Sequence, residues 1–140
     1  MKKNTGKLQE ELMRVPDLDR FLADNEKNFN TRSMAENIEE LFQKKNISKS
    51  ALAKQSAMSE VYLHQVFAGR RKPSRNRILC LCFGLSATLE ETQTLLKQCG
   101  YAQLFPRDRR DAIIIYGIVH HMDLFAVNDK LYVEGEESIF

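Results

Sequence analysis

The stretch that decides the fold is ISKSALAKQSAMSEVYLHQVFAGRRKPS, residues 47–74. Ser48 predicts the start of a helix of about two turns, because its hydroxyl can accept from the free amides of a first turn. Ser59 predicts a second helix over residues 59–68, and Gly69 suits the left-handed conformation that ends a helix. Two short helices with a tight connection, followed by a basic loop, are typical of a helix-turn-helix.

The second predicted helix has two distinct faces. Three apolar residues at helical spacing are expected to face the core, namely Leu63, Val66 and Phe67. The outer face then carries Val61, Tyr62 and Gln65. A glutamine amide can form two hydrogen bonds with an adenine edge in the major groove, and apolar side chains can contact a thymine methyl group. Gln65 is therefore the predicted base reader.

Charge is distributed unevenly along the chain. The formal net charge is +2, yet residues 44–77 hold nine Lys or Arg against one Glu, and the segments on both sides are net acidic. A charge excess confined to this stretch would attract a polyanion. Nucleic acid is thus the favoured partner, ahead of an ordinary basic surface.

Residues 47–74 resemble the helix-turn-helix of the lambda-repressor-like (XRE) family. The resemblance rests on the Leu52-Ala53 pair, on Met58 followed by Ser59, and on the closing residues Gly69, Lys72, Pro73 and Ser74. It implies a compact bundle of about five helices over roughly residues 31–100. It also implies base contacts at Glu60, Val61, Tyr62 and Gln65, and phosphate contacts at Ser48, Lys49, Ser59, Arg70, Arg71 and Lys72.

Three residues fit the family pattern less well. Ala57 replaces the turn glycine, which costs strain only where that residue needs a positive φ. Phe67 replaces a glutamate near the end of the helix, where it would extend the core or contact a partner. Glu60 would be repelled by phosphates unless it accepts from a cytosine amino group, or it simply complements the helix dipole. Both readings of Glu60 remain open.

The whole chain is predicted to be all-α, with the helix-turn-helix bundle extended by a C-terminal helical hairpin. Residues 1–30 form an N-terminal extension, partly helical or flexible, which Pro16 interrupts and which ends in a polar linker over residues 25–30. Residues 31–100 form the DNA-binding domain, opened by a capping box of Ser33 and Glu36. Residues 101–140 form a helical extension for dimerisation or partner docking.

The C-terminal half contains an apparent repeat with an offset of 35 residues. Leu89, Leu96 and Gly100 align with Leu124, Leu131 and Gly135, and Thr88 aligns with the capping residue Asp123. Two helical hairpins side by side would explain the pattern, although chance is an alternative. A short β-hairpin over residues 127–133 is a second alternative to the last helix.

Several protein classes lose support from the sequence. The six glycines are scattered, so they form neither a Walker loop nor a dinucleotide-binding cluster, and the apolar run at residues 112–119 is too short to span a membrane. Cys80 and Cys82 lie two apart on a helix and are expected in the core, while the adjacent His120 and His121 are expected to cap a helix end. We therefore expect no enzyme, no cofactor and no metal.

The leading hypothesis is a cytoplasmic, sequence-specific transcriptional regulator that places residues 59–68 in the major groove of double-stranded DNA. The odd number of cysteines and the lack of a signal peptide favour the cytoplasm. A homodimer is expected, because one short helix reads only a few base pairs. The alternative is a protein-interaction adaptor or regulatory subunit that uses the same fold without reading DNA, which Glu60 and the acidic C-terminal half favour.

Overall fold

The computed structural model describes residues 3–29 and 32–140, and every regular element within these ranges is helical. The expected all-α class is confirmed. The alternative of a β-hairpin over residues 127–133 is wrong, because helix α9 (Leu124–Val133) runs through that segment. By its contacts the chain divides into two compact units, Met1–Arg32 and Ser33–Phe140.

The first unit contains helices α1 (Thr5–Arg14) and α2 (Leu18–Asp24) and the short 3-10 helix η1 (Glu26–Asn28). Pro16 lies between α1 and α2, at the predicted interruption. The segment predicted as a polar linker is partly helical, and Asn25 within it is buried. Asn30 and Thr31, where this linker was expected to meet the DNA-binding domain, lie outside the described residues.

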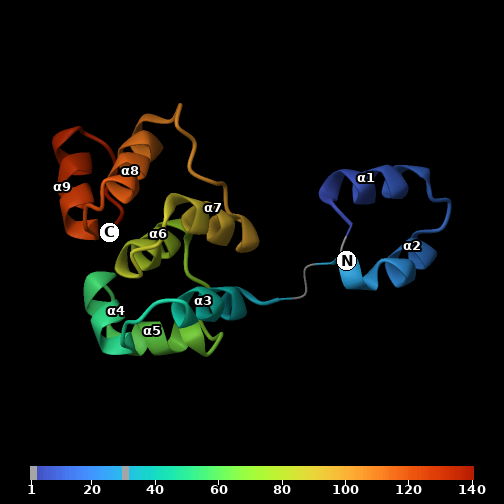
Figure 1. Ribbon diagram of the computed structural model, residues 1–140, viewed down its shortest axis with the longest axis horizontal. Helices are drawn as coiled ribbons and strands as arrows, with labels where there is room; N and C mark the ends of the chain where they lie inside the picture. Colours follow the sequence, from blue (N-terminus) through green and yellow to red (C-terminus); the bar gives the residue numbers. More distant parts are fainter. Residues whose placement is uncertain (1–2, 30–31) are drawn as a thin grey trace. The chain divides into compact units, whose positions relative to one another are not determined.

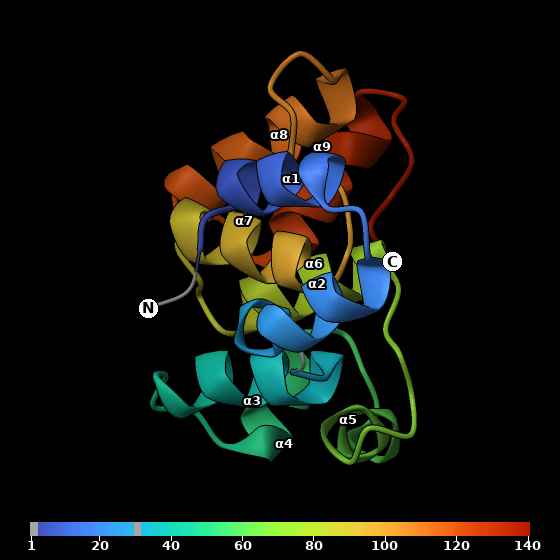
Figure 2. The ribbon, with the colours of Figure 1, turned by 90° about the vertical axis from the view of Figure 1, so that its right-hand side faces the viewer.

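The second unit holds three layers of helices. One outer layer contains α3 (Met34–Gln43), α4 (Lys49–Gln55) and α5 (Glu60–Phe67). The other two layers are helical hairpins, one of α6 (Arg75–Gly84) and α7 (Leu89–Gln98), the other of α8 (Arg109–Val119) and α9. The α6–α7 hairpin lies between the other two layers (Figure 1), an order also visible in Figure 2. Helix α4 packs on α6 and α3 on α7, while α6 contacts α9 and α7 contacts α8.

Local sequence determines where these helices begin. The capping side chain of each helix in the second unit accepts a hydrogen bond from a first-turn amide, which satisfies a donor that has no partner within the helix. The caps are Ser33, Ser48, Ser59, Ser74, Thr88, Asp108 and Asp123. Ser33 and Thr88 form full capping boxes with Glu36 and Glu91.

The internal repeat is present in the structure. Ser86 and His121 follow the first helix of each hairpin with φ of 51° and 59°, and Gly100 and Gly135 follow the second helix with φ of 79° and 72°. The segment after each hairpin is also held alike. Gln93 Oε1 accepts from the Leu104 amide at 2.7 Å, and Asn128 Oδ1 accepts from the Ile139 amide at 2.7 Å. Chance does not account for equivalent contacts at one offset.

A pair of reciprocal arginine contacts defines how the two hairpins are related. Arg75 donates to an Asp111 carboxylate oxygen at 3.1 Å, and Arg110 donates to Asn76 Oδ1 at 3.0 Å. The donors Arg75 and Arg110 are 35 residues apart, and so are the acceptors Asn76 and Asp111, so each hairpin donates to the other from an equivalent position. The α6–α7 and α8–α9 hairpins are therefore related by a pseudo-two-fold axis.

One apolar core runs through the second unit. Leu63 and Val66, predicted to face inward, are 1% and 0% exposed. Cys80 and Cys82 are also buried, as expected. Burial of each large aliphatic side chain contributes about 1.5–3 kcal/mol, so this core holds the α3–α5 layer on the hairpin behind it. None of the helices in the described part of the chain is long and apolar enough to cross a bilayer.

Candidate nucleic-acid interface

Helices α4 and α5 are joined by a turn that depends on Ala57. Its φ is +55°, and the amide of the next residue, Met58, donates to the Ala53 carbonyl at 2.9 Å to close the turn. Alanine in this left-handed conformation is strained, because its Cβ approaches the following carbonyl oxygen. Alanine at this position therefore has a cost, and the turn forms despite it.

The predicted base-reading residues lie together along α5. Glu60 and Val61 are exposed, Val61 at 69%, while Tyr62 and Gln65 are half-buried. The Arg77 guanidinium lies over the Tyr62 ring, 5.0 Å from its centroid. Gln65 Oε1 accepts from Arg71 Nε at 3.1 Å. Two of the four side chains are thus positioned by arginines.

The loop after α5 folds back onto the end of the helix. Gly69 has φ +77°, as its predicted role as terminator requires. The Arg70 and Arg71 amides both donate to the Gln65 carbonyl, at 2.9 and 3.3 Å. The side chains of Arg70, Arg71 and Lys72 remain exposed. Arg70 and Arg71 are therefore held at the end of α5, and Lys72 follows them directly in the chain.

The predicted phosphate-binding residues of α4 and α5 have mixed positions. Ser48 and Ser59 use their Oγ atoms as caps, accepting from Ala51 and Tyr62 amides, so each hydroxyl keeps its proton to donate. Lys49 is exposed, and its Nζ lies 4.8 Å from the centroid of the Phe67 ring.

Phe67 itself contributes to packing. Its ring meets that of Phe42 edge to face at 5.1 Å between centroids. Of the two roles considered for this residue, extension of the core is the one that its position supports. The Lys49 cation lies over the outer part of this aromatic pair, so the pair also helps to place a charge beside α5.

Internal ion pairs reduce the field of the basic stretch. Lys45 Nζ lies 2.7 Å from a Glu91 oxygen, and Arg75 lies 3.1 Å from Asp111. The hydrogen bond from Lys45 holds the pKa of Glu91 below its usual value. Lys45 and Arg75 thus fasten the outer layer and the two hairpins together, whereas Lys49, Arg77 and the loop arginine Arg71 lie against side chains of α5.

Sequence reasoning missed these arginine contacts. Arg71 is six residues from Gln65 and Arg77 fifteen from Tyr62, and neither spacing is a helical neighbour distance. Only the position of Arg71 in the loop directly after α5 could have suggested that its side chain would reach back. Nothing in the sequence signals the Arg77 contact.

Residues with possible reactive chemistry serve structural roles. Burial raises the pKa of the Cys80 thiol to about 11 and that of Cys82 to about 12, so both thiols are protonated near neutral pH. His120 ends α8 and stacks on Tyr116 at 4.1 Å between ring centroids. Within the described residues, no three His, Cys, Asp or Glu side chains are grouped to hold a metal ion.

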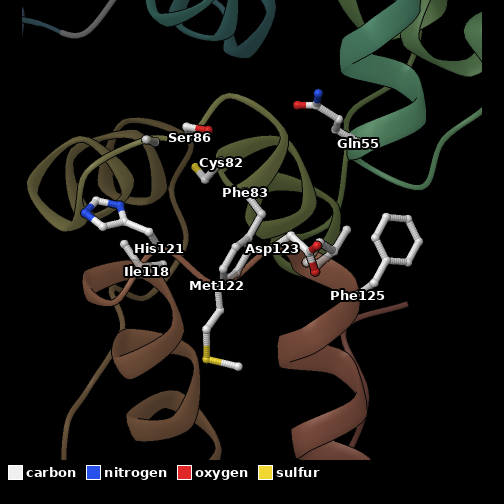
Figure 3. Close-up of a pocket in the computed structure, with 11 residues that line it drawn as sticks. Gln55, Cys82, Phe83, Ser86, Ile118, His121, Met122, Asp123 and Phe125 are labelled. Atoms are coloured by element: carbon white, nitrogen blue, oxygen red, sulfur yellow. The ribbon is translucent and has the colours of Figure 1, made fainter.

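A pocket of about 360 Å³ lies where the turns of the two hairpins approach α4. Ser86 and His121 border one side, Gln55 and Phe125 the other, with the Phe83 ring between them (Figure 3). The Asp123 carboxylate at its edge is occupied in capping α9. The pocket therefore lacks a set of convergent free charges, and the surface of α5 remains the stronger candidate site.

No protein-family model, curated protein or solved structure matches the chain. The argument for a function therefore rests on the geometry of α4, α5 and the basic loop.

Proposed function

We propose that this chain is a sequence-specific DNA-binding regulator with a lambda-repressor-like bundle, which inserts α5 into the major groove. The observation that carries the proposal is the placement of Gln65 next to Arg71. A side chain that can read a base lies 3.1 Å from a cation that can reach a phosphate.

In the proposed complex, phosphates position the protein and α5 reads the sequence. Lys49, Arg70, Arg71 and Lys72 contact the backbone on either side of the groove. Gln65 exchanges its bond with Arg71 for an adenine edge, which releases Arg71 to a phosphate. Because Arg77 packs on the Tyr62 ring, Tyr62 meets its base with less loss of side-chain freedom.

The first experiment tests base reading. Binding sites are selected from a random DNA pool, and the affinity for the selected site and for single-base variants is measured by fluorescence anisotropy. Gln65→Ala should cost ~1 to 3 kcal/mol at one base pair and leave binding to unrelated DNA nearly unchanged. Gln98→Ala, which truncates an exposed glutamine on α7, is the matched control. An unchanged sequence preference in the Gln65 variant would contradict the assigned reading face.

The second experiment tests the phosphate contacts. Replacing Arg70, Arg71 and Lys72 together with alanine should weaken binding to all sequences and reduce the salt slope by about 3, at roughly 0.9 ions per contact. A control that replaces Lys97 and Arg107, both exposed elsewhere on the unit, should change the slope little. If the slope falls by only about 2, two of these three side chains contact phosphate, and replacing Arg71 alone tests whether it is the one that does not.

The second candidate function is a protein-interaction adaptor that does not read DNA. Glu60 favours it, because this carboxylate lies in the first turn of α5, where a helix entering the groove approaches phosphates. Glu60→Gln should raise affinity for unrelated DNA if the regulator hypothesis is right, since it removes a repulsive charge. If the wild-type chain retains no DNA fragment at low salt but captures a protein partner, the adaptor hypothesis replaces it.

A further inference from the structure

The outer face of the α8–α9 hairpin contains an apolar groove with a volume of about 490 Å³. Ala112, Ile113, Tyr116 and Met122 form its apolar wall, and charged side chains lie along its edge. These charges belong to Arg109, Lys130 and Glu134, with both Arg109 and Lys130 paired to Glu134, at 2.9 and 3.2 Å.

The pseudo-two-fold axis shows what kind of surface this groove is. Ile113 and Tyr116 are equivalent to Ile78 and Leu81, which are both 0% exposed in the core beneath the α3–α5 layer. Gly84 in the first hairpin lets α4 approach so closely that a Cβ there would collide with Ser56 Oγ. The α6–α7 hairpin thus uses this face to bind helices.

The equivalent face of α8–α9 is open. Tyr116 is 58% exposed, and Val119, the equivalent of Gly84, is 50% exposed. No helix of the described residues in the second unit covers them. Large apolar side chains at positions that are buried in the sister hairpin mark an interaction surface rather than a solvent face.

We propose that this face binds the same face of a second copy of the chain, forming a two-fold dimer. The charges at the edge of the groove select this occupant, because they complement themselves. Lys130 lies in the last turn of α9 and Glu134 is the C-cap residue four positions later, so an antiparallel copy of α9 places Lys130 against Glu134 of the partner subunit, and the reverse. A uniformly acidic or basic helix would leave one of these charges opposed to its own sign.

Tyr116 is the anchor of this interface. Its stacking on His120 already limits its side-chain freedom, so little more is lost when it packs into the groove of the partner subunit. The role of the dimer rests on the proposed function, since on DNA it would present two recognition helices to two half-sites. Dimerisation itself is independent of DNA.

The test measures the dissociation constant of the DNA-free chain by sedimentation equilibrium. Tyr116→Glu should weaken the dimer at least about thirtyfold, as expected for an interface anchor. Lys130→Glu and Glu134→Lys should each weaken self-association about tenfold, because like charges then meet across the axis. An equimolar mixture of these two variants should dimerise again, since each carries the charges that the other lacks.

Met13→Glu is the control, because Met13 is an equally apolar and 79% exposed residue in the first unit. It should leave the dissociation constant unchanged. The proposal is overturned if the wild-type chain stays monomeric at the highest concentration at which all the variants are soluble. The proposal is also overturned if Met13→Glu dissociates the dimer and Tyr116→Glu does not. A mixture of Lys130→Glu and Glu134→Lys that fails to dimerise overturns it as well. None of these outcomes affects the DNA-binding proposal, which is measured separately.

Discussion

The pseudo-two-fold axis predicts that Asn76→Asp will stabilise the protein. Across this axis the Arg75 guanidinium meets the Asp111 carboxylate, whereas the Arg110 guanidinium meets the neutral amide of Asn76 at the equivalent position. The substitution supplies the missing charge 3.0 Å from Arg110. It also places a negative charge in the first turn of α6, where the helix dipole favours it.

The magnitude follows from these two contributions. A charge at a helix N-terminus contributes about 0.3–1 kcal/mol, and a partly exposed ion pair about 0.2–1 kcal/mol. The expected gain is therefore about 1 kcal/mol, or a shift in the urea midpoint of about 0.5 M for a slope of about 2 kcal/mol/M. The reverse exchange, Asp111→Asn, should cost about 2 kcal/mol, since Asp111 is 7% exposed and its bonds to Arg75 lose their charge.

Tyrosine fluorescence is a suitable probe of unfolding. The chain has no Trp, and its four tyrosines, Tyr62, Tyr101, Tyr116 and Tyr132, all belong to the second unit. The signal therefore follows the unit that contains the mutated pair. If Asn76→Asp is neutral or destabilising while Asp111→Asn has no effect, the two arginine contacts are not equivalent, and the reasoning from the axis fails.

Four further outcomes are expected from local features. Ala57→Gly should raise stability by about 1 kcal/mol in urea unfolding, because glycine relieves the strain at φ +55°. Ser56→Ala should also stabilise the protein, by up to about 1 kcal/mol, because the buried Ser56 Oγ has no hydrogen-bond partner within the described residues. A loss of stability would mean that this hydroxyl does have a hydrogen-bond partner. The Glu91 pKa lies below 4.5 in the folded state, so its contribution to stability is present above that pH and is lost as the pH falls through the folded pKa. Lys45→Met should reduce this fall in the free energy of unfolding at acid pH. If the fall is unchanged, other carboxyl groups cause it. Cys82, with a thiol pKa of about 12, should resist iodoacetamide in the native protein at pH 8 and react when unfolded; rapid native labelling would contradict its burial.

Much of the fold is readable from short stretches of sequence. Ser48 and Ser59 locate the starts of α4 and α5, because an N-cap needs only the amides of the next three residues. The inward position of Leu63 and Val66 follows from helical spacing alone. The sequence also predicted Gly69 as a left-handed helix end, since few other residues adopt that conformation without strain.

The candidate site was predictable in outline and not in its contacts. Placing Gln65 on the outer face of α5 required only the helical period. Its bond to Arg71 required the path of the loop, and the Arg77 contact with Tyr62 required the packing of α6 beside α5. Long, flexible arginine side chains reach whichever partner the backbone brings near, so spacing along the chain does not identify that partner.

The sequence by itself determined the helix boundaries, the helix-turn-helix pattern and the repeat at an offset of 35 residues, since each depends on residue types at fixed local spacing. Only the tertiary structure decided how the repeated hairpins face each other. Arg75 and Arg110 cross between hairpins to reach Asp111 and Asn76, and such reciprocal contacts exist only once both apolar faces are buried together. The same packing decides that Leu81 is buried while its equivalent, Tyr116, remains exposed.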